Sequence, residues 1–268
     1  MGKQMDSRRA ARAAKTTLAA LALLAWHGAA QAQTATLEAG LLHHRLSDGL
    51  GQWNQQFVRG TWRTSEATVW NADLVNARQF GAHGTLAVAG VTHVFNDDWY
   101  GSLGGSYGSS FFYPKGRADA VLNRKLGAAK NIVATFGVTA VNARDGHRDR
   151  SVLLGVSWYL PNALVLQGGT RINRSDPGGV MANAKYVAAT WGYNKQQYIS
   201  VRYDQGEEAY QYIGAGVTDL LVNFRSNVAS ATWRKWLGPT HGFQLRAEAY
   251  HNPYYNRRGL EAALFKEF

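Results

Sequence analysis

The chain has 268 residues, 46% of them hydrophobic and 18% charged, and its formal net charge is +11. The basic residues are dispersed and form neither a patch nor a recognised reading motif, which argues against nucleic acid as a partner. The lack of cysteine excludes disulfides and thiolate metal sites, and we expect neither a cofactor nor a bound metal.

The first 32 residues have the pattern of a secretory signal peptide. Basic residues open the chain, a short apolar run covers 18–26, and Ala30 and Ala32 supply small side chains at the cleavage positions. The apolar run is far shorter than the roughly 20 residues that a transmembrane helix needs. We therefore expect a signal peptide over 1–32 and a single mature domain over 33–268, with 24 basic and 17 acidic residues.

The mature chain alternates apolar and polar residues with a period of two, and helical periodicity is hard to find in it. The clearest segment is 243–250, in which Phe243, Leu245 and Ala247 alternate with polar neighbours. The last segment also has an apolar face and ends in Phe268. A terminal aromatic on an amphipathic last strand is typical of outer-membrane barrels, so we assign Phe268 as the assembly signal that the barrel-assembly machinery recognises.

Turn signals divide the mature chain into strands joined by two alternating classes of connection. The short class lies at 65–67, 96–98, 127–130, 161–162, 194–195 and 238–240, and the longer class at 47–51, 79–84, 109–118, 144–149, 173–179, 206–218 and 252–256. Outer-membrane barrels have an even strand number, short periplasmic turns and longer outer loops. We predict an all-β fold, a transmembrane up-and-down antiparallel barrel of about 14 strands, with 12 as the alternative count.

The main competing fold is a soluble β-sandwich or lipocalin-like barrel, whose apolar face points inward. A closed barrel of about 14 strands is too wide for its own apolar side chains to fill, so the apolar face must point to lipid. Tryptophan placement agrees, because seven of the eight mature tryptophans lie beside short connections, where a periplasmic girdle is expected. The predicted girdle consists of Trp62, Trp70, Trp99, Trp158, Trp191, Trp233 and Trp236.

Several short stretches together carry a family resemblance. They are Leu46-Ser47-Asp48-Gly49 followed by Trp53, Arg78-Gln79-Phe80, Phe95-Asn96-Asp97-Asp98-Trp99-Tyr100-Gly101, Gly206-Glu207-Glu208 and Arg258-Gly259-Leu260-Glu261. In order and spacing the chain resembles the YaiO family of outer-membrane β-barrel proteins over essentially its whole mature length. The resemblance implies an outer-membrane location and brings no reaction, ligand or catalytic residue with it.

The polar face of the predicted strands should line the lumen, where charges of opposite sign on neighbouring strands can pair. A salt-bridged, plugged lumen is one interpretation. The other is a narrow channel whose arginines favour anionic or sugar-like solutes, as charged rings do in pores. The predicted lumen-lining residues are Arg59, Arg63, Asp73, Arg202, Asp204, Arg234, Arg246, Glu248 and Glu261.

Catalytic chemistry has one weak candidate, formed by His147, Asp149 and Ser151 at alternate positions beside a long connection. A solvated outer loop is the ordinary interpretation of that stretch, and we predict no enzymatic activity. Glu207 and Glu208 could bind a divalent cation or bridge to lipopolysaccharide, but a solvated acidic loop tip explains them as well.

We expect a bacterial outer-membrane protein whose partners are outer-membrane lipids and lipopolysaccharide, with glycans as a further candidate. The leading functional hypothesis is a narrow passage for envelope solutes or surface glycans. The alternatives are a closed structural or adhesive barrel that acts through its loops, and a lipid-modifying enzyme.

Overall fold

Fourteen antiparallel strands make up the part of the chain that the computed structural model describes, residues 34–211 and 221–268. The predicted signal peptide, 1–32, lies outside these residues. The strands are β1 (Ala35–Leu46), β2 (Gln52–Arg63), β3 (Thr68–Gln79), β4 (Ala82–Val94), β5 (Trp99–Gly108), β6 (Gly116–Leu126), β7 (Ile132–Asn142), β8 (Arg148–Leu160), β9 (Leu164–Asp176), β10 (Val180–Tyr193), β11 (Gln197–Gln211), β12 (Leu221–Trp236), β13 (His241–His251) and β14 (Asn256–Glu267).

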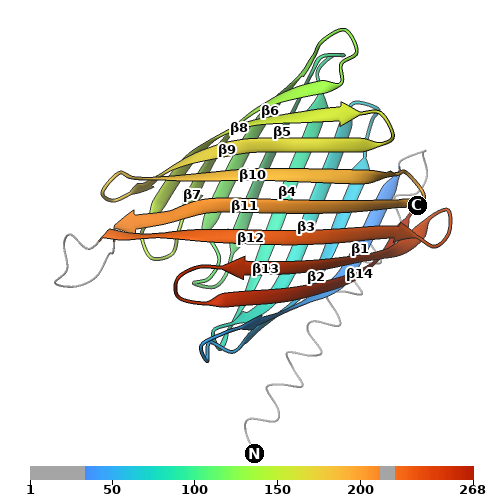
Figure 1. Cartoon of the computed structure of the whole chain (residues 1–268). Helices are drawn as coiled ribbons and strands as arrows, with labels where there is room; N and C mark the ends of the chain where they lie inside the picture. Colours follow the sequence, from blue (N-terminus) through green and yellow to red (C-terminus); the bar gives the residue numbers. More distant parts are fainter. Residues whose placement is uncertain (1–33, 212–220) are drawn as a thin grey trace, which may run out of the picture.

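The strands form a closed up-and-down barrel. Each strand pairs with its neighbours in sequence, and β1 pairs with β14 to close the sheet. Figure 1 shows β9 to β14 across the near wall, with the strands of the far wall running at a steep angle to them. A strand of 12 residues such as β14 extends about 40 Å at 3.3 Å per residue, enough to cross a membrane at a tilt. The predicted fold and strand count are therefore confirmed.

The exterior of the barrel is apolar. Leu103, Val187, Leu260 and Leu264 all point outward and are between 62 and 70% exposed. On β14, Leu260 and Leu264 alternate with inward residues that are buried, namely Gly259, Glu261, Ala263 and Phe265. Apolar side chains that stand outward on every wall are stable against lipid, whereas in water each would forgo roughly 1.5–3 kcal/mol of burial. No helix within 34–211 or 221–268 is long and apolar enough to cross a membrane.

The predicted short connections agree with the structure, whereas several predicted long ones are shorter than expected. The loop predicted at 79–84 is a turn of two residues, Phe80 and Gly81, both with positive φ (50° and 79°) as a type I′ hairpin requires. The loop predicted at 173–179 is reduced to 177–179, and Glu207 and Glu208 lie within β11 instead of on a loop tip. At these three places the strands extend beyond the predicted boundaries as polar hairpins. Their sequences lack the apolar alternation from which strands are predicted.

Candidate functional site

The barrel interior gathers the charged residues of the strands. All nine residues predicted for the lumen occupy inward register positions, set by pairs such as Arg59 opposite both Glu38 and Asp73. Arg63 lies at the end of β2 nearest the short turns and is exposed. Asp73 faces Arg59 from β3. Several inward charges were not predicted from the sequence, namely Glu38, Arg117, Asp119, Arg171 and Arg257.

Two carboxylates from the strands that close the barrel form the first ionic cluster. Arg59 donates from Nη1 to Glu38 Oε1 at 3.0 Å and to Glu261 Oε1 at 3.1 Å. Arg234 donates to the other Glu38 oxygen at 2.6 Å, and Gln244 donates to Glu261 at 3.3 Å. Glu38 and Glu261 are 7% and 5% exposed, so each buried acid is satisfied by groups from neighbouring strands. This cluster ties β1, β2, β12, β13 and β14 together across the closure.

Glu248 is the centre of a second cluster, nearer the outer loops. Arg246 donates to one of its carboxylate oxygens at 2.9 Å and Arg257 donates to the other at 2.8 Å. His44 Nε2 lies 3.4 Å from the same Glu248 oxygen as Arg257. The guanidinium of Arg257 also lies over the rings of Trp53 and Tyr250, 4.9 and 4.7 Å from their centroids. His43, next in sequence, faces outward, as expected for adjacent residues on a strand.

The opposite wall carries arginines that pair along their own strands. Arg117 makes two bonds to Asp119, both of 2.7 Å, and Arg202 makes two to Asp204, of 2.8 and 2.6 Å. The same spacing, an arginine followed two positions later by an acid on the same face, recurs at Arg246 and Glu248. This repeated spacing was the signal that could have identified Arg117 and Asp119 from the sequence.

Arg171 differs from these pairs. It points inward from β9, opposite Leu153 on β8 and Ala184 on β10. Within the described residues its side chain makes no ion pair and no hydrogen bond. The charged groups whose fields reach it are Arg117, Asp119 and Arg202. The wall from β6 to β11 therefore presents three guanidinium groups to the lumen.

The weak catalytic candidates lie together at the outer end of β8, and Asp149 and Ser151 both face inward. His147 is buried, and its Nδ1 lies 3.0 Å from Asp145 Oδ2 while its ring meets that of Tyr210 edge to face. Asp145 is partly desolvated, which raises the pKa of its carboxyl, but hydrogen bonds from the backbone and ring of His147 outweigh this and lower that pKa. Ser151 itself is 7% exposed, which limits access of a substrate to its hydroxyl.

The tryptophans beside the short turns do face outward, with one exception. Trp62 and Trp70 are directly opposed on β2 and β3, and Trp158, Trp191 and Trp233 are 39 to 47% exposed. Trp236 was assigned to this girdle wrongly. It points inward, is 8% exposed, and donates its indole N–H to Glu267 at 3.1 Å. Phe268 follows β14 and is exposed, with its backbone N–H bonded to Ala35 O at 2.8 Å.

No group of three or more metal-ligating side chains is present among the residues that the structure describes. The aromatic residues of the loop between β5 and β6 pack against each other and their neighbours. Phe111 meets Phe112 edge to face at 5.4 Å, and Phe112 meets Tyr113 at 4.8 Å. This loop therefore holds its own aromatic cluster.

Comparison with known proteins supports the fold. A family model described as the YaiO membrane beta barrel domain matches residues 34–211. No protein of curated function matches the chain. Three similar solved structures are the CymD monoaromatic hydrocarbon channel (6% identity, TM-score 0.55, 88% of each chain covered), the anion-selective porin from Comamonas acidovorans (7%, 0.50, 88% of this chain and 98% of the porin) and a bacterial polysaccharide outer membrane secretin (12%, 0.50, 88% and 97%). At these identities the likeness concerns the fold alone.

Proposed function

Because this chain belongs to the YaiO membrane β-barrel family and is an outer-membrane barrel, we propose that it forms a narrow passage for anionic solutes of the cell envelope, acidic sugars and glycans among them. The proposal rests on the chemistry of the inner wall.

One observation carries the proposal: in every ion pair between arginine and carboxylate inside the described barrel, the arginine is the more exposed partner. The side chains of Arg59, Arg202 and Arg246 are 36, 44 and 40% exposed, against 8, 34 and 14% for Glu38, Asp204 and Glu248. The remaining inward pairs follow the same order. A solute in the lumen therefore meets guanidinium groups first, with the balancing carboxylates set behind them.

Arg171 adds a cation that forms no ion pair with a carboxylate of the described barrel, although the field of Asp119 reaches it. Guanidinium groups bind carboxylates and phosphates through paired hydrogen bonds and remain charged at any physiological pH. Three of them along one wall, at Arg117, Arg171 and Arg202, offer successive weak sites of the kind that lets a solute enter and also leave.

The direct test is ion selectivity of the refolded protein in planar bilayers under a KCl gradient. We expect a reversal potential on the anion-selective side. The variant Arg171→Gln should move it toward zero, whereas Arg78→Gln, on the outer face of β3, should leave it unchanged. Cation selectivity of the wild-type barrel, or equal effects of the two variants, would refute the proposal.

A second candidate function is a closed barrel that acts through its outer loops, and the contact of Arg234 with Glu38 favours it. This contact joins β12 to β1 inside the barrel, past β13 and β14, so its side chains occupy part of the lumen there. A closed barrel would show no conductance even when its folding is verified by the mobility shift that barrels show on heating in SDS gels. Conductance that increases in Arg234→Ala would instead identify this contact as the constriction of a passage.

A further inference from the structure

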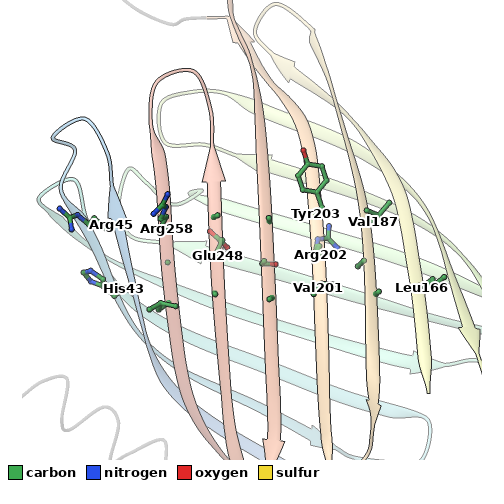
Figure 2. A pocket seen from close by; sticks show the side chains of 18 residues that line it. His43, Arg45, Leu166, Val187, Val201, Arg202, Tyr203, Glu248 and Arg258 are labelled. Carbon is green, nitrogen blue, oxygen red and sulfur yellow. The ribbon is translucent and has the colours of Figure 1, made fainter. Parts of the chain in front are cut away.

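The outer surface of the barrel has an apolar groove of 1020 Å³ across the strands β9 to β14 and β1. Its floor consists of alanines, since Ala229 faces Ala249 and Ala231 faces Ala247 between β12 and β13. Larger side chains rise on both sides, with Leu260 on β14 and Val201 and Tyr203 on β11. Figure 2 looks onto this groove, with His43, Arg45 and Arg258 on one side and Val187, Val201 and Tyr203 on the other.

Two arginines stand at the end of this groove that is nearer the outer loops. Arg45 on β1 and Arg258 on β14 are directly opposite each other in the register, and both are exposed and face outward. Neither makes an ion pair within 34–211 or 221–268. Like charges placed directly opposite each other on a sheet are destabilising. An anion bound between the two guanidinium groups would remove that cost.

The same arrangement recurs on the other side of the barrel. A second exterior groove, of 830 Å³, is lined by Ala118, Ala120 and Ala140 together with larger apolar side chains. At its loop end Arg150 on β8 is directly opposite Arg174 on β9, again outward. Arg174 has one partner, Asp176, at 3.5 Å, and Arg150 has none among the described residues. Apolar grooves that end in opposed arginines therefore occur twice.

We infer that each groove binds a lipid A unit of lipopolysaccharide, with an acyl chain on the alanine floor and a phosphate between the opposed arginines. The groove admits hydrocarbon because its lining is apolar, and its cationic end lies at the loop side, where the outer leaflet is. A phosphate monoester carries nearly two negative charges at neutral pH, which matches two guanidinium groups, and each can donate two hydrogen bonds to it. The phosphodiester of a phospholipid carries only one charge.

Binding of defined lipids to the refolded protein in detergent micelles, followed by native mass spectrometry, tests this inference. The probes are lipid A with both phosphates, dephosphorylated lipid A and phosphatidylglycerol. We expect phosphorylated lipid A to bind best of the three probes. The double variant Arg45→Gln/Arg258→Gln should lower the affinity of the first groove for it at least about tenfold, because hydrogen bonds between charged groups are lost. Ala231→Phe should weaken binding by filling the floor while leaving the charges in place.

The matched control is Arg78→Gln, which removes an outward, exposed cation at the loop end of β3 that lines neither groove. It should bind lipid A as the wild type does, and the heat-induced gel shift verifies that every variant is folded. Equal affinity for lipid A and phosphatidylglycerol would overturn the inference. A folded protein that carries all four substitutions, Arg45→Gln, Arg258→Gln, Arg150→Gln and Arg174→Gln, and still binds lipid A as the wild type does would also overturn it.

Discussion

Arg234 on β12 donates a hydrogen bond of 2.6 Å to Glu38 on β1, although β13 and β14 lie between their strands. The two residues are 196 positions apart in sequence, and only closure of the barrel brings them together. Arg59 binds the second oxygen of Glu38 and continues to Glu261. The first and last strands are thus joined by side chains in the lumen as well as by backbone hydrogen bonds.

Replacement of Glu38 by glutamine should destabilise the barrel. The variant leaves Arg59 and Arg234 with one fewer charged acceptor in a site where Glu38 is buried, and a hydrogen bond between charged groups contributes about 1.5–3 kcal/mol. Because Arg59 is partly exposed to water in the lumen, we expect a loss of about 2 kcal/mol in the free energy of unfolding. Urea titration in lipid vesicles measures it. Glu66→Gln, in the exposed turn before β3, is the control, and an equal loss there would contradict the expected role of Glu38.

Gly259 on β14 has room for no side chain, because a Cβ at this position would overlap the imidazole of His44 on β1. We expect Gly259→Ala to lower stability by about 1–3 kcal/mol through overpacking. In Gly168→Ala the new methyl finds its nearest atom at 3.5 Å, so stability should change by less than about 0.5 kcal/mol. In a His44→Ala background, where the imidazole is absent, Gly259→Ala should cost less than about 0.5 kcal/mol. If the alanine at 259 costs the same without the histidine ring, the clash is not its cause.

The turn between β6 and β7 holds an ion pair whose pH dependence can be measured. Lys130 Nζ lies 2.8 Å from Asp98 Oδ1 in the neighbouring short turn, and its hydrogen bond and charge lower the pKa of Asp98 and raise that of Lys130. The stabilisation from Asp98 is present above its unfolded pKa and is lost as pH falls through the folded value. That from Lys130 is present below its unfolded pKa and is lost as pH rises through the folded value.

NMR titration of the Asp98 carboxyl carbon checks this pair. Lys130→Gln should return the pKa of Asp98 upward, toward its ordinary value, whereas Lys115→Gln, on the outer loops, should not move it. An Asp98 pKa that is unchanged by the loss of Lys130 would show that the contact does not persist in solution.

The strand count was predictable because alternation and turn residues mark each strand independently, as Phe243 to Tyr250 do on β13. Loop boundaries were less predictable. Beyond the hydrocarbon the outer face of a strand can be polar. Arg78 and His83, which are paired on the outer face of β3 and β4, therefore lack the alternation that identifies a strand. Trp236 shows a related limit, since its closeness to a short turn was visible but its inward face depended on the register of β12.

The inward charges were partly predictable, because the alternation of apolar and polar residues shows which residues of a strand share a face. Arg246 and Glu248 were found from the clean alternation of β13, whereas Glu38 was missed because its strand begins directly after the predicted signal peptide. Partner choice could not be predicted at all, because Glu38 pairs with Arg234 only through the closure of β1 on β14. The order of exposure within the ion pairs likewise depends on side-chain packing that no periodicity encodes.

The claim that exposed luminal arginines select anions is tested most directly by the reversal potential of the double variant Arg117→Gln/Arg202→Gln, measured beside the wild type under one KCl gradient. The variant leaves Asp119 and Asp204 without their arginine partners, so we predict that an anion-selective wild-type barrel becomes cation-selective. A variant that conducts with the reversal potential of the wild type would contradict the account.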